Sequence, residues 1–151
     1  YDVLVKDVSL AEVIRPTAEE GVDCVSSNID LSAAELELVS MVGRETLLRD
    51  ALERLEREGQ TSYDYVLIDC PPSLGVLSIN ALAAASRVLV PLQAEFFALQ
   101  GMAKLIEVID LVQRRLNPRV FLSGIVACKV DRRPRLTQEV LDEASASAGA
   151  T

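Results

Sequence analysis

The sequence predicts an α/β fold, with a mostly parallel β-sheet and helices on both of its faces. Short apolar runs alternate with amphipathic helical patterns along the 151 residues, which is typical of a parallel sheet. Residues 65–68, Tyr-Val-Leu-Ile, are apolar without interruption, as expected of a strand buried on both faces of such a sheet. The length fits one domain, and we expect residues 1–151 to form a single one.

In the N-terminal half, Ser9 and Glu12 have the spacing of a capping box, which predicts a short helix through Ile14 that Pro16 ends. Residues 22–25 are expected to form a strand. The apolar residues of the long helical region that follows fall on one face: Leu47, Leu48, Ala51, Leu52 and Leu55. Opposite charges four residues apart mark its solvated face: Glu45 with Arg49, Asp50 with Arg54, and Glu53 with Arg57.

In the C-terminal half, two central strands are expected at residues 65–69 and 88–90, on either side of a helix over 76–85. A further strand at 121–126 and a last helix at 136–146 complete the pattern. Between them, apolar residues at helical spacing predict a long helix: Leu99, Met102, Ile106, Ile109 and Leu116.

Composition narrows the class of protein. Half of the residues are apolar, yet no apolar run reaches the length of a membrane span and no signal peptide is recognisable, which predicts a soluble intracellular domain. The three cysteines, Cys24, Cys70 and Cys128, are far apart and embedded in apolar stretches, which favours buried, reduced thiols. The chain has no histidine and no close cysteine pair, so a zinc-type metal site is not expected.

Asp69 is the carboxylate whose position most strongly indicates a functional site. It follows the apolar run directly, and Pro71 and Pro72 stop the strand because proline has no amide to donate to a central ladder. An acid at the carboxyl edge of a parallel sheet is well placed to bind Mg²⁺ through water. The alternative is an aspartate that only caps the following turn, and the pattern alone does not decide between the two.

The segment Tyr63-Asp-Tyr-Val-Leu-Ile-Asp-Cys-Pro-Pro-Ser-Leu-Gly75 resembles the second nucleotide motif, Walker B, of the ParA/Soj chromosome-partitioning ATPases. Residues 90–101, Val-Pro-Leu-Gln-Ala-Glu-Phe-Phe-Ala-Leu-Gln-Gly, and residues 27–38 are similar to further segments of that family. The resemblance runs from Tyr1 to about Glu143 and implies a P-loop NTPase-like fold. The family's phosphate loop, G-x-x-x-x-G-K-[ST], is not found in the sequence. We therefore expect a central fragment, truncated at both ends and inactive alone.

The resemblance assigns roles to individual residues. Asp69 would hold Mg²⁺ through water. Asp69, Pro71, Pro72, Cys128 and Asp131 would lie at the bound ATP, and none would be a catalytic residue. The resemblance also implies a homodimer that closes around ATP, with Glu95 and Gln100 at its interface. Two positions depart from the family: Cys128 and Pro134 stand where threonine is usual, which bears on the adenine contacts.

Charge is unevenly distributed in this acidic chain. The formal charge is −8, yet residues 114–135 carry seven basic groups and one acid. Arg114, Arg115 and Arg119 come at the end of a predicted helix, where the macrodipole favours cations. The turn Asp131-Arg-Arg-Pro-Arg135 resembles the family's DNA-binding Asp-x-Arg-Thr turn, with its arginine at Arg133. Arg132, Arg133 and Arg135 are thus candidate DNA contacts; the alternative is a solvated loop without a partner.

The function implied by the resemblance is DNA segregation in the bacterial cytoplasm, on the nucleoid. ATP and Mg²⁺ would close the dimer, the dimer would bind DNA of any sequence, and a ParB-type centromere-binding protein would stimulate hydrolysis. No membrane contact is expected. Two alternatives remain open: a MinD-like membrane-associated ATPase, and a non-catalytic interaction domain without a phosphate loop.

Overall fold

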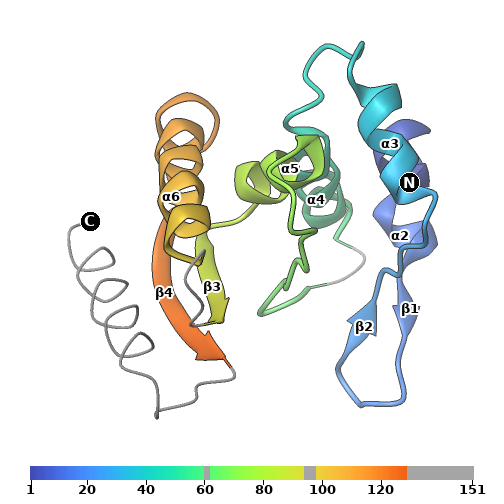
Figure 1. Ribbon diagram of the computed structural model, residues 1–151. Coiled ribbons are helices and arrows are strands. Elements are labelled where there is room, and N and C mark those ends of the chain that lie inside the picture. The colour runs from blue at the N-terminus through green and yellow to red at the C-terminus, as the bar shows by residue number, and fades with distance from the viewer. Residues whose placement is uncertain (60–61, 94–97, 129–151) are drawn as a thin grey trace. The chain divides into compact units, whose positions relative to one another are not determined.

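The computed structural model describes residues 1–59, 62–93 and 98–128. Backbone packing divides the chain into two compact units, residues 1–84 and 85–151 (Figure 1).

The first unit consists mainly of helices. They are α1 (Asp2–Val5), α2 (Leu10–Val13), α3 (Leu31–Leu38), α4 (Leu47–Glu58) and α5 (Val76–Ala84). Ser9 caps α2 as predicted, because its hydroxyl accepts a hydrogen bond from the Ala11 amide at 3.3 Å. Helix α4 ends at Gly59, whose left-handed conformation (φ 63°) is the conformation that most favours glycine.

The core of the first unit forms where α2 packs on α4. Leu10, Ala51 and Leu55 are buried together, and partly buried side chains surround them, among them Val3, Leu52 and Tyr63. The predicted apolar face of α4 is therefore the face that the helix buries, while charged side chains such as Arg57 remain exposed.

Two predicted strands of this unit are corrected by the structure. Instead of a strand over residues 22–25, β2 (Asp23–Cys24) is a two-residue, exposed partner of β1 (Arg15–Pro16) in an antiparallel hairpin. Residues 65–69 are irregular rather than a buried strand: Tyr65 is 86% and Leu67 94% exposed. A strand requires backbone hydrogen bonds to a neighbour, and no strand among the described residues pairs with this segment.

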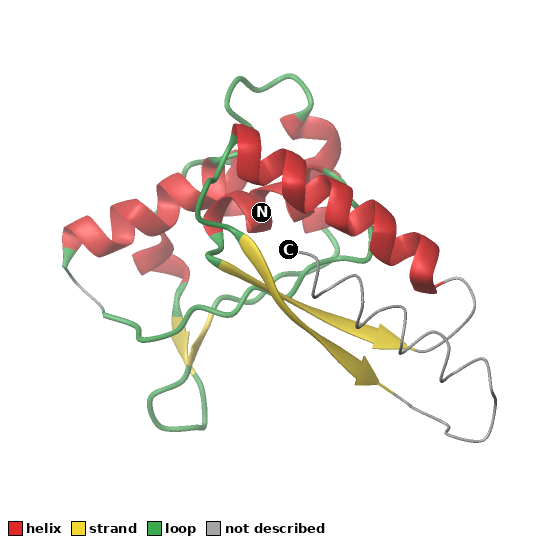
Figure 2. Cartoon of the chain, turned by 90° about the vertical axis from the view of Figure 1, so that its left-hand side faces the viewer, coloured by secondary structure: helices red, strands yellow, loops and turns green. Residues whose placement is uncertain are grey.

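The second unit is a strand–helix–strand crossover (Figure 2). Strand β3 (Arg87–Gln93) leads into α6 (Ala98–Arg115), and β4 (Phe121–Cys128) returns parallel to β3. The parallel pairing was the central expectation for the sheet, and it is confirmed. The strand expected over 88–90 is longer in the structure: β3 continues to Gln93, with Pro91 opposite Val126. A proline fits into a strand wherever no amide donor is needed towards the neighbouring strand.

A β-bulge interrupts this ladder near its start. Val88 lies opposite Leu122, whereas the next residue, Leu89, lies opposite Gly124, so Ser123 is the additional residue on β4. The Ser123 hydroxyl donates a hydrogen bond to the Val88 carbonyl at 3.2 Å. The bulged side chain thus bonds back to the neighbouring strand.

Asn117 organises the turn between α6 and β4. Its side chain is 4% exposed; its amide group donates to the Ala85 carbonyl at 2.6 Å and its oxygen accepts from the Arg119 amide at 3.1 Å. Met102, Ile109 and Val112 form the buried face of α6, which confirms the predicted apolar stripe at Met102 and Ile109. The helix predicted over 136–146 lies outside the described residues.

Candidate functional site

Asp69 opens an exposed loop that runs from the irregular segment into α5. The loop contains Pro71 and Pro72, both exposed, and ends at Gly75, one residue before α5 begins. Among the described residues, none forms a hydrogen bond or ion pair with the Asp69 carboxylate. The structure therefore places these three predicted site residues on one loop, with the carboxylate open to solvent.

Buried polar side chains hold the far end of this loop. The Ser78 hydroxyl donates a hydrogen bond to the Ser73 carbonyl, and the Ile79 amide bonds to the Gly75 carbonyl at 3.1 Å. Asn80 is 1% exposed and donates to the Val76 carbonyl at 2.9 Å. Because both polar side chains lie inside the protein, the start of α5 is a fixed support for the Asp69 loop.

Glu35 is a residue near this loop that sequence reasoning missed. Its carboxylate lies against Gly75, where even a methyl group would overlap it. One carboxylate oxygen of Glu35 is buried without a hydrogen-bond partner among the described residues. The signal that could have found it is its position within residues 27–38, one of the segments that carry the family resemblance.

The cysteines correct another expectation. All three are free thiols, but Cys24 and Cys70 are exposed and Cys128 is half-buried, so burial was wrong for the first two. At Cys70, nearby protein atoms remove part of the hydration of the thiolate, and this raises the pKa of the thiol; the adjacent Asp69 charge raises the pKa further. The apolar run that suggested burial is itself exposed.

The Asp69 carboxylate is a group of the kind that supplies a ligand to Mg²⁺. Mg²⁺ in phosphate-binding proteins uses one or two carboxylates and completes its coordination with waters and substrate phosphates. Within the described ranges, no three acidic, cysteine or histidine side chains are grouped as an all-protein cage would require. Asp69, an exposed carboxylate at the end of an apolar segment, has the donor chemistry of one such ligand.

In the second unit, the carboxyl ends of both strands lie together. Gln93 and Cys128 are the last residues of β3 and β4 and are partners in the register. The Cys128 thiol contacts the Val126 carbonyl at 3.5 Å. Gln100 lies in the first turn of α6. The remaining predicted site residues fall outside the described ranges: Glu95, Asp131, Arg132, Arg133 and Arg135.

A separate hollow of about 460 Å³ lies within the first unit, between the end of α4 and the segment around Tyr63. Leu52, Leu55 and Val66 line it together with Tyr63, whose hydroxyl donates to the Asp23 carboxylate at 2.7 Å. None of the predicted site residues lines this hollow. Across the described helices, no segment has the length and apolarity needed to cross a membrane.

Comparison with known proteins shows which family and which relatives this chain is similar to. The AAA domain family matches residues 1–122. The sporulation initiation inhibitor protein Soj of Bacillus subtilis is 41% identical over 143 residues, which cover 95% of this chain and 55% of Soj. The chromosome partitioning protein ParA of Myxococcus xanthus is 45% identical, covering 95% of this chain and 49% of that protein. The chain thus spans about half the length of these relatives.

Solved structures show the same fold. Cobyrinic acid a,c-diamide synthase from Mycobacterium smegmatis, solved with ADP and magnesium and with an ATP analogue and magnesium, is 39% identical. Its alignment has a TM-score of 0.83 and covers 96% of this chain and 57% of that one. Cyanothece McdA has a TM-score of 0.83 at 18% identity, over 98% of this chain and 57% of its own, and supports the fold alone.

The α/β fold is therefore that of the P-loop NTPases, as predicted. Both the family match and the similarity to partitioning proteins extend through Asp69 and its loop. The chain belongs to the AAA domain family and, within it, to the ParA/Soj type.

Proposed function

We propose that this chain is part of an ATPase that segregates DNA, with Asp69 as its magnesium-organising carboxylate. The observation that carries the proposal is the open Asp69 carboxylate at the head of a loop fixed on α5, in a chain 41–45% identical to partitioning proteins. The solved relative with 39% identity binds a nucleotide and magnesium, which supports ATP and Mg²⁺ as ligands here.

In this proposal Asp69 acts through a water of the Mg²⁺ shell. When bound, the magnesium ion would neutralise charge on the phosphates during their transfer. Pro71 and Pro72 limit the conformations of the loop that follows Asp69, and Ser78 anchors that loop at Ser73. Asp131 and Cys128 would lie near the nucleotide base. The groups that cradle the phosphates would come from the part of the complete protein that its relatives have beyond the matched span.

Dimer formation and DNA binding complete the proposed cycle. ATP would close two subunits through a surface that includes Glu95 and Gln100. The closed dimer would bind DNA of any sequence through Arg132, Arg133 and Arg135, because guanidinium groups pair well with backbone phosphates. A ParB-type protein bound at a centromere-like site would stimulate hydrolysis and release the dimer. The site of action would be the nucleoid in the bacterial cytoplasm.

The decisive experiment compares Asp69→Asn with Asp64→Asn in the complete protein. Both substitutions remove one exposed carboxylate from the same segment, but only Asp69 directly follows the apolar run. We expect Asp69→Asn to reduce Mg²⁺-dependent ATP hydrolysis roughly 100-fold or more and Asp64→Asn to leave it near the parent rate. Equal activity of the parent and Asp69→Asn proteins would refute the assignment.

A second candidate, ATP-dependent amide synthesis, rests on the 39% identical solved relative, which is named a cobyrinic acid a,c-diamide synthase. Both candidates use ATP and Mg²⁺, so hydrolysis alone does not separate them. Stimulation of hydrolysis by DNA supports segregation. Hydrolysis that responds to an amide donor and a carboxylic acid, and not to DNA, supports amide synthesis.

A further inference from the structure

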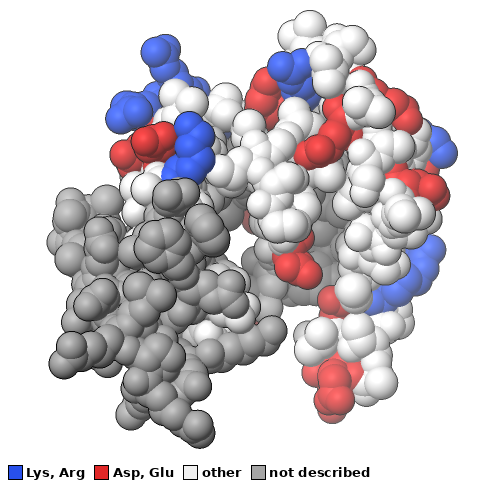
Figure 3. Space-filling view, viewed as in Figure 1, with Lys and Arg blue, Asp and Glu red and all other residues white. Residues whose placement is uncertain are grey.

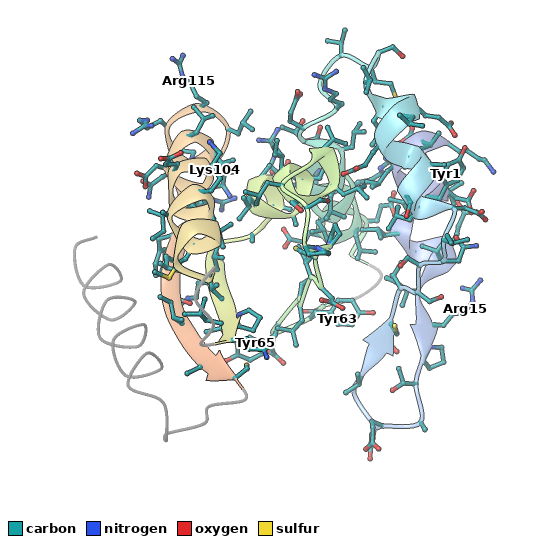
Figure 4. All side chains as sticks on the ribbon, viewed as in Figure 1. Tyr1, Arg15, Tyr63, Tyr65, Lys104 and Arg115 are labelled. Carbon is teal, nitrogen blue, oxygen red and sulfur yellow. The ribbon has the colours of Figure 1, made fainter. Side chains whose placement is uncertain are left out.

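Four arginines gather at one end of the second unit, at the edge opposite the carboxyl ends of its strands. We call this group the arginine corner: Arg87, Arg114, Arg115 and Arg119. Arg87 begins β3, Arg114 and Arg115 end α6, and Arg119 lies two residues before β4. All four are exposed. In Figure 3 basic side chains project from the end of α6 at the upper left, and Figure 4 shows Arg115 pointing away from it.

The fold, not the sequence, brings Arg87 to the other three. Arg87 and Phe121 are partners in the β3–β4 register, and the Arg87 guanidinium lies 5.5 Å from the centre of the Phe121 ring. Asn117 fixes the adjacent turn through its bonds to Ala85 and Arg119. The corner is therefore attached to a hydrogen-bonded turn rather than to a loose loop.

None of the four guanidinium groups has an ionic partner among the described residues. Every other described cation is engaged. Five form ion pairs, namely Lys6, Arg44, Arg49, Arg54 and Lys104, while Arg15 and Arg57 bond to backbone carbonyls. On α6, Glu107 pairs with Lys104, which leaves Asp110 as the only described acid one turn from the corner. The corner thus has excess positive charge in a chain whose net charge is −8.

Stabilisation of the helix end does not account for this excess. The end of α6 is closed by its own backbone, because the Val112 carbonyl accepts bonds from Leu116 at 2.8 Å and Asn117 at 2.9 Å. The corner side chains donate to no carbonyl among the described residues. One or two cations would be enough to interact favourably with the helix dipole, and this interaction is weak at an exposed position.

We propose that the arginine corner is a second contact for the phosphate backbone of nucleic acid, separate from the segment Arg132–Arg135. This inference rests on the DNA-binding part of the proposed function. Strand β4 has eight residues, so its two ends are about 23 Å apart, and Arg132–Arg135 follows its far end in the sequence. Guanidinium groups suit phosphates because they pair in a planar, bidentate manner. An anionic membrane surface would instead favour cations that lie beside a broad apolar face. At the corner, the apolar group is the Phe121 ring, and the Arg87 guanidinium partly covers it.

The test measures binding of a fluorescent duplex DNA of random sequence to the complete protein with ATP, at 50–200 mM salt. The test variant is Arg114→Gln/Arg115→Gln/Arg119→Gln. The matched control, Lys6→Gln/Arg57→Gln/Lys104→Gln, removes the same charge from residues already engaged elsewhere. Arg133→Ala is measured in parallel, together with vesicles of phosphatidylserine and phosphatidylcholine. Circular dichroism confirms that each variant is folded.

We expect the corner variant to bind DNA more weakly and to lower the slope of log affinity against log salt by about 2–3 units, since each lost phosphate contact removes about 0.9. The control should keep a slope close to that of the parent. A corner variant that equals the control overturns the inference, even if Arg133→Ala weakens binding and so supports the proposed function. A loss confined to vesicle binding would assign the corner to membranes and overturn it too. A parent protein that does not bind DNA would refute both proposals.

Discussion

The side-chain oxygen of Asn80 accepts a hydrogen bond from the Leu48 amide at 3.1 Å, so a residue of α5 caps the start of α4. The residue at the usual capping position, Thr46, makes no side-chain capping bond. Asn80 also donates to the Arg44 carbonyl at 2.6 Å and to Val76 in its own helix. The buried Asn80 side chain thus connects α5, which follows the Asp69 loop in the sequence, to α4, the largest helix of the first unit.

Replacing Asn80 by Ala should destabilise the first unit markedly. The substitution removes three hydrogen bonds and leaves the Leu48 amide and the Arg44 carbonyl without this partner, for an expected loss of about 2–3 kcal/mol in the free energy of unfolding. Urea denaturation followed by circular dichroism measures it. Thr46→Ala is the control and should cost less than about 0.5 kcal/mol, because its half-buried side chain caps no amide. The reverse order of the two losses would contradict this account.

Gly59→Ala should destabilise α4 through the backbone alone. Apart from its chain neighbours, no described residue has an atom within 4 Å of the position that a Cβ would take, but the left-handed conformation (φ 63°) is unfavourable for alanine. We expect a loss of about 1 kcal/mol in the free energy of unfolding. Gly101→Ala, inside α6 and equally free of contacts, should be neutral or stabilising by comparison.

Cys70 should report on the charge of its neighbour. Its pKa is raised by partial desolvation and by Asp69, so its thiolate, the form that reacts with iodoacetamide, becomes abundant only at higher pH than for an ordinary cysteine. Asp69→Asn removes the charge contribution and should shift the pH profile of Cys70 alkylation downward. Mass spectrometry of the labelled peptide follows the reaction. An unchanged profile would show that the Asp69 charge does not act on the thiol.

Arg133→Ala in the complete protein should weaken binding to all DNA sequences alike. A phosphate contact carries no sequence information, and its loss should lower the salt slope by about one unit. Anisotropy with two unrelated duplexes measures both quantities. Arg57→Ala, in the first unit, is the control, because its guanidinium already bonds to the Glu53 carbonyl. Affinity that remains unchanged at low salt would rule out the contact.

Local patterns in the sequence predicted α2, α4, α5 and α6. The apolar spacing of residues 47–55 gave α4, the Ser9 cap gave α2, and the stripe from Met102 to Ile109 gave the buried face of α6. These elements form their hydrogen bonds within the element itself, so nearby residues suffice to specify them. The parallel orientation of β3 and β4 also agrees with the predicted class of sheet.

The failures concern structure that depends on distant partners. Tyr65 and Leu67 have the composition of a buried strand but are exposed, since a strand exists only where a neighbour supplies its ladder. The exposure of Cys70 follows from the same cause. Neither the approach of Glu35 to Gly75 nor the capping of α4 by Asn80 has a signal in sequence spacing, because both join residues more than thirty positions apart.

The sequence by itself determined the α/β class, the helices α2, α4, α5 and α6 and the candidate carboxylate Asp69, because periodicity and a pair of prolines are local properties of the chain. Only the tertiary structure decided which polar groups support the Asp69 loop and which of the described cations have no ionic partner among the described residues. Arg87 joins Arg114, Arg115 and Arg119 because parallel strands begin at the same edge of a sheet, and Asn117 fixes the turn between them. Such proximity between residues far apart in the sequence depends on long-range packing, which no local sequence pattern encodes.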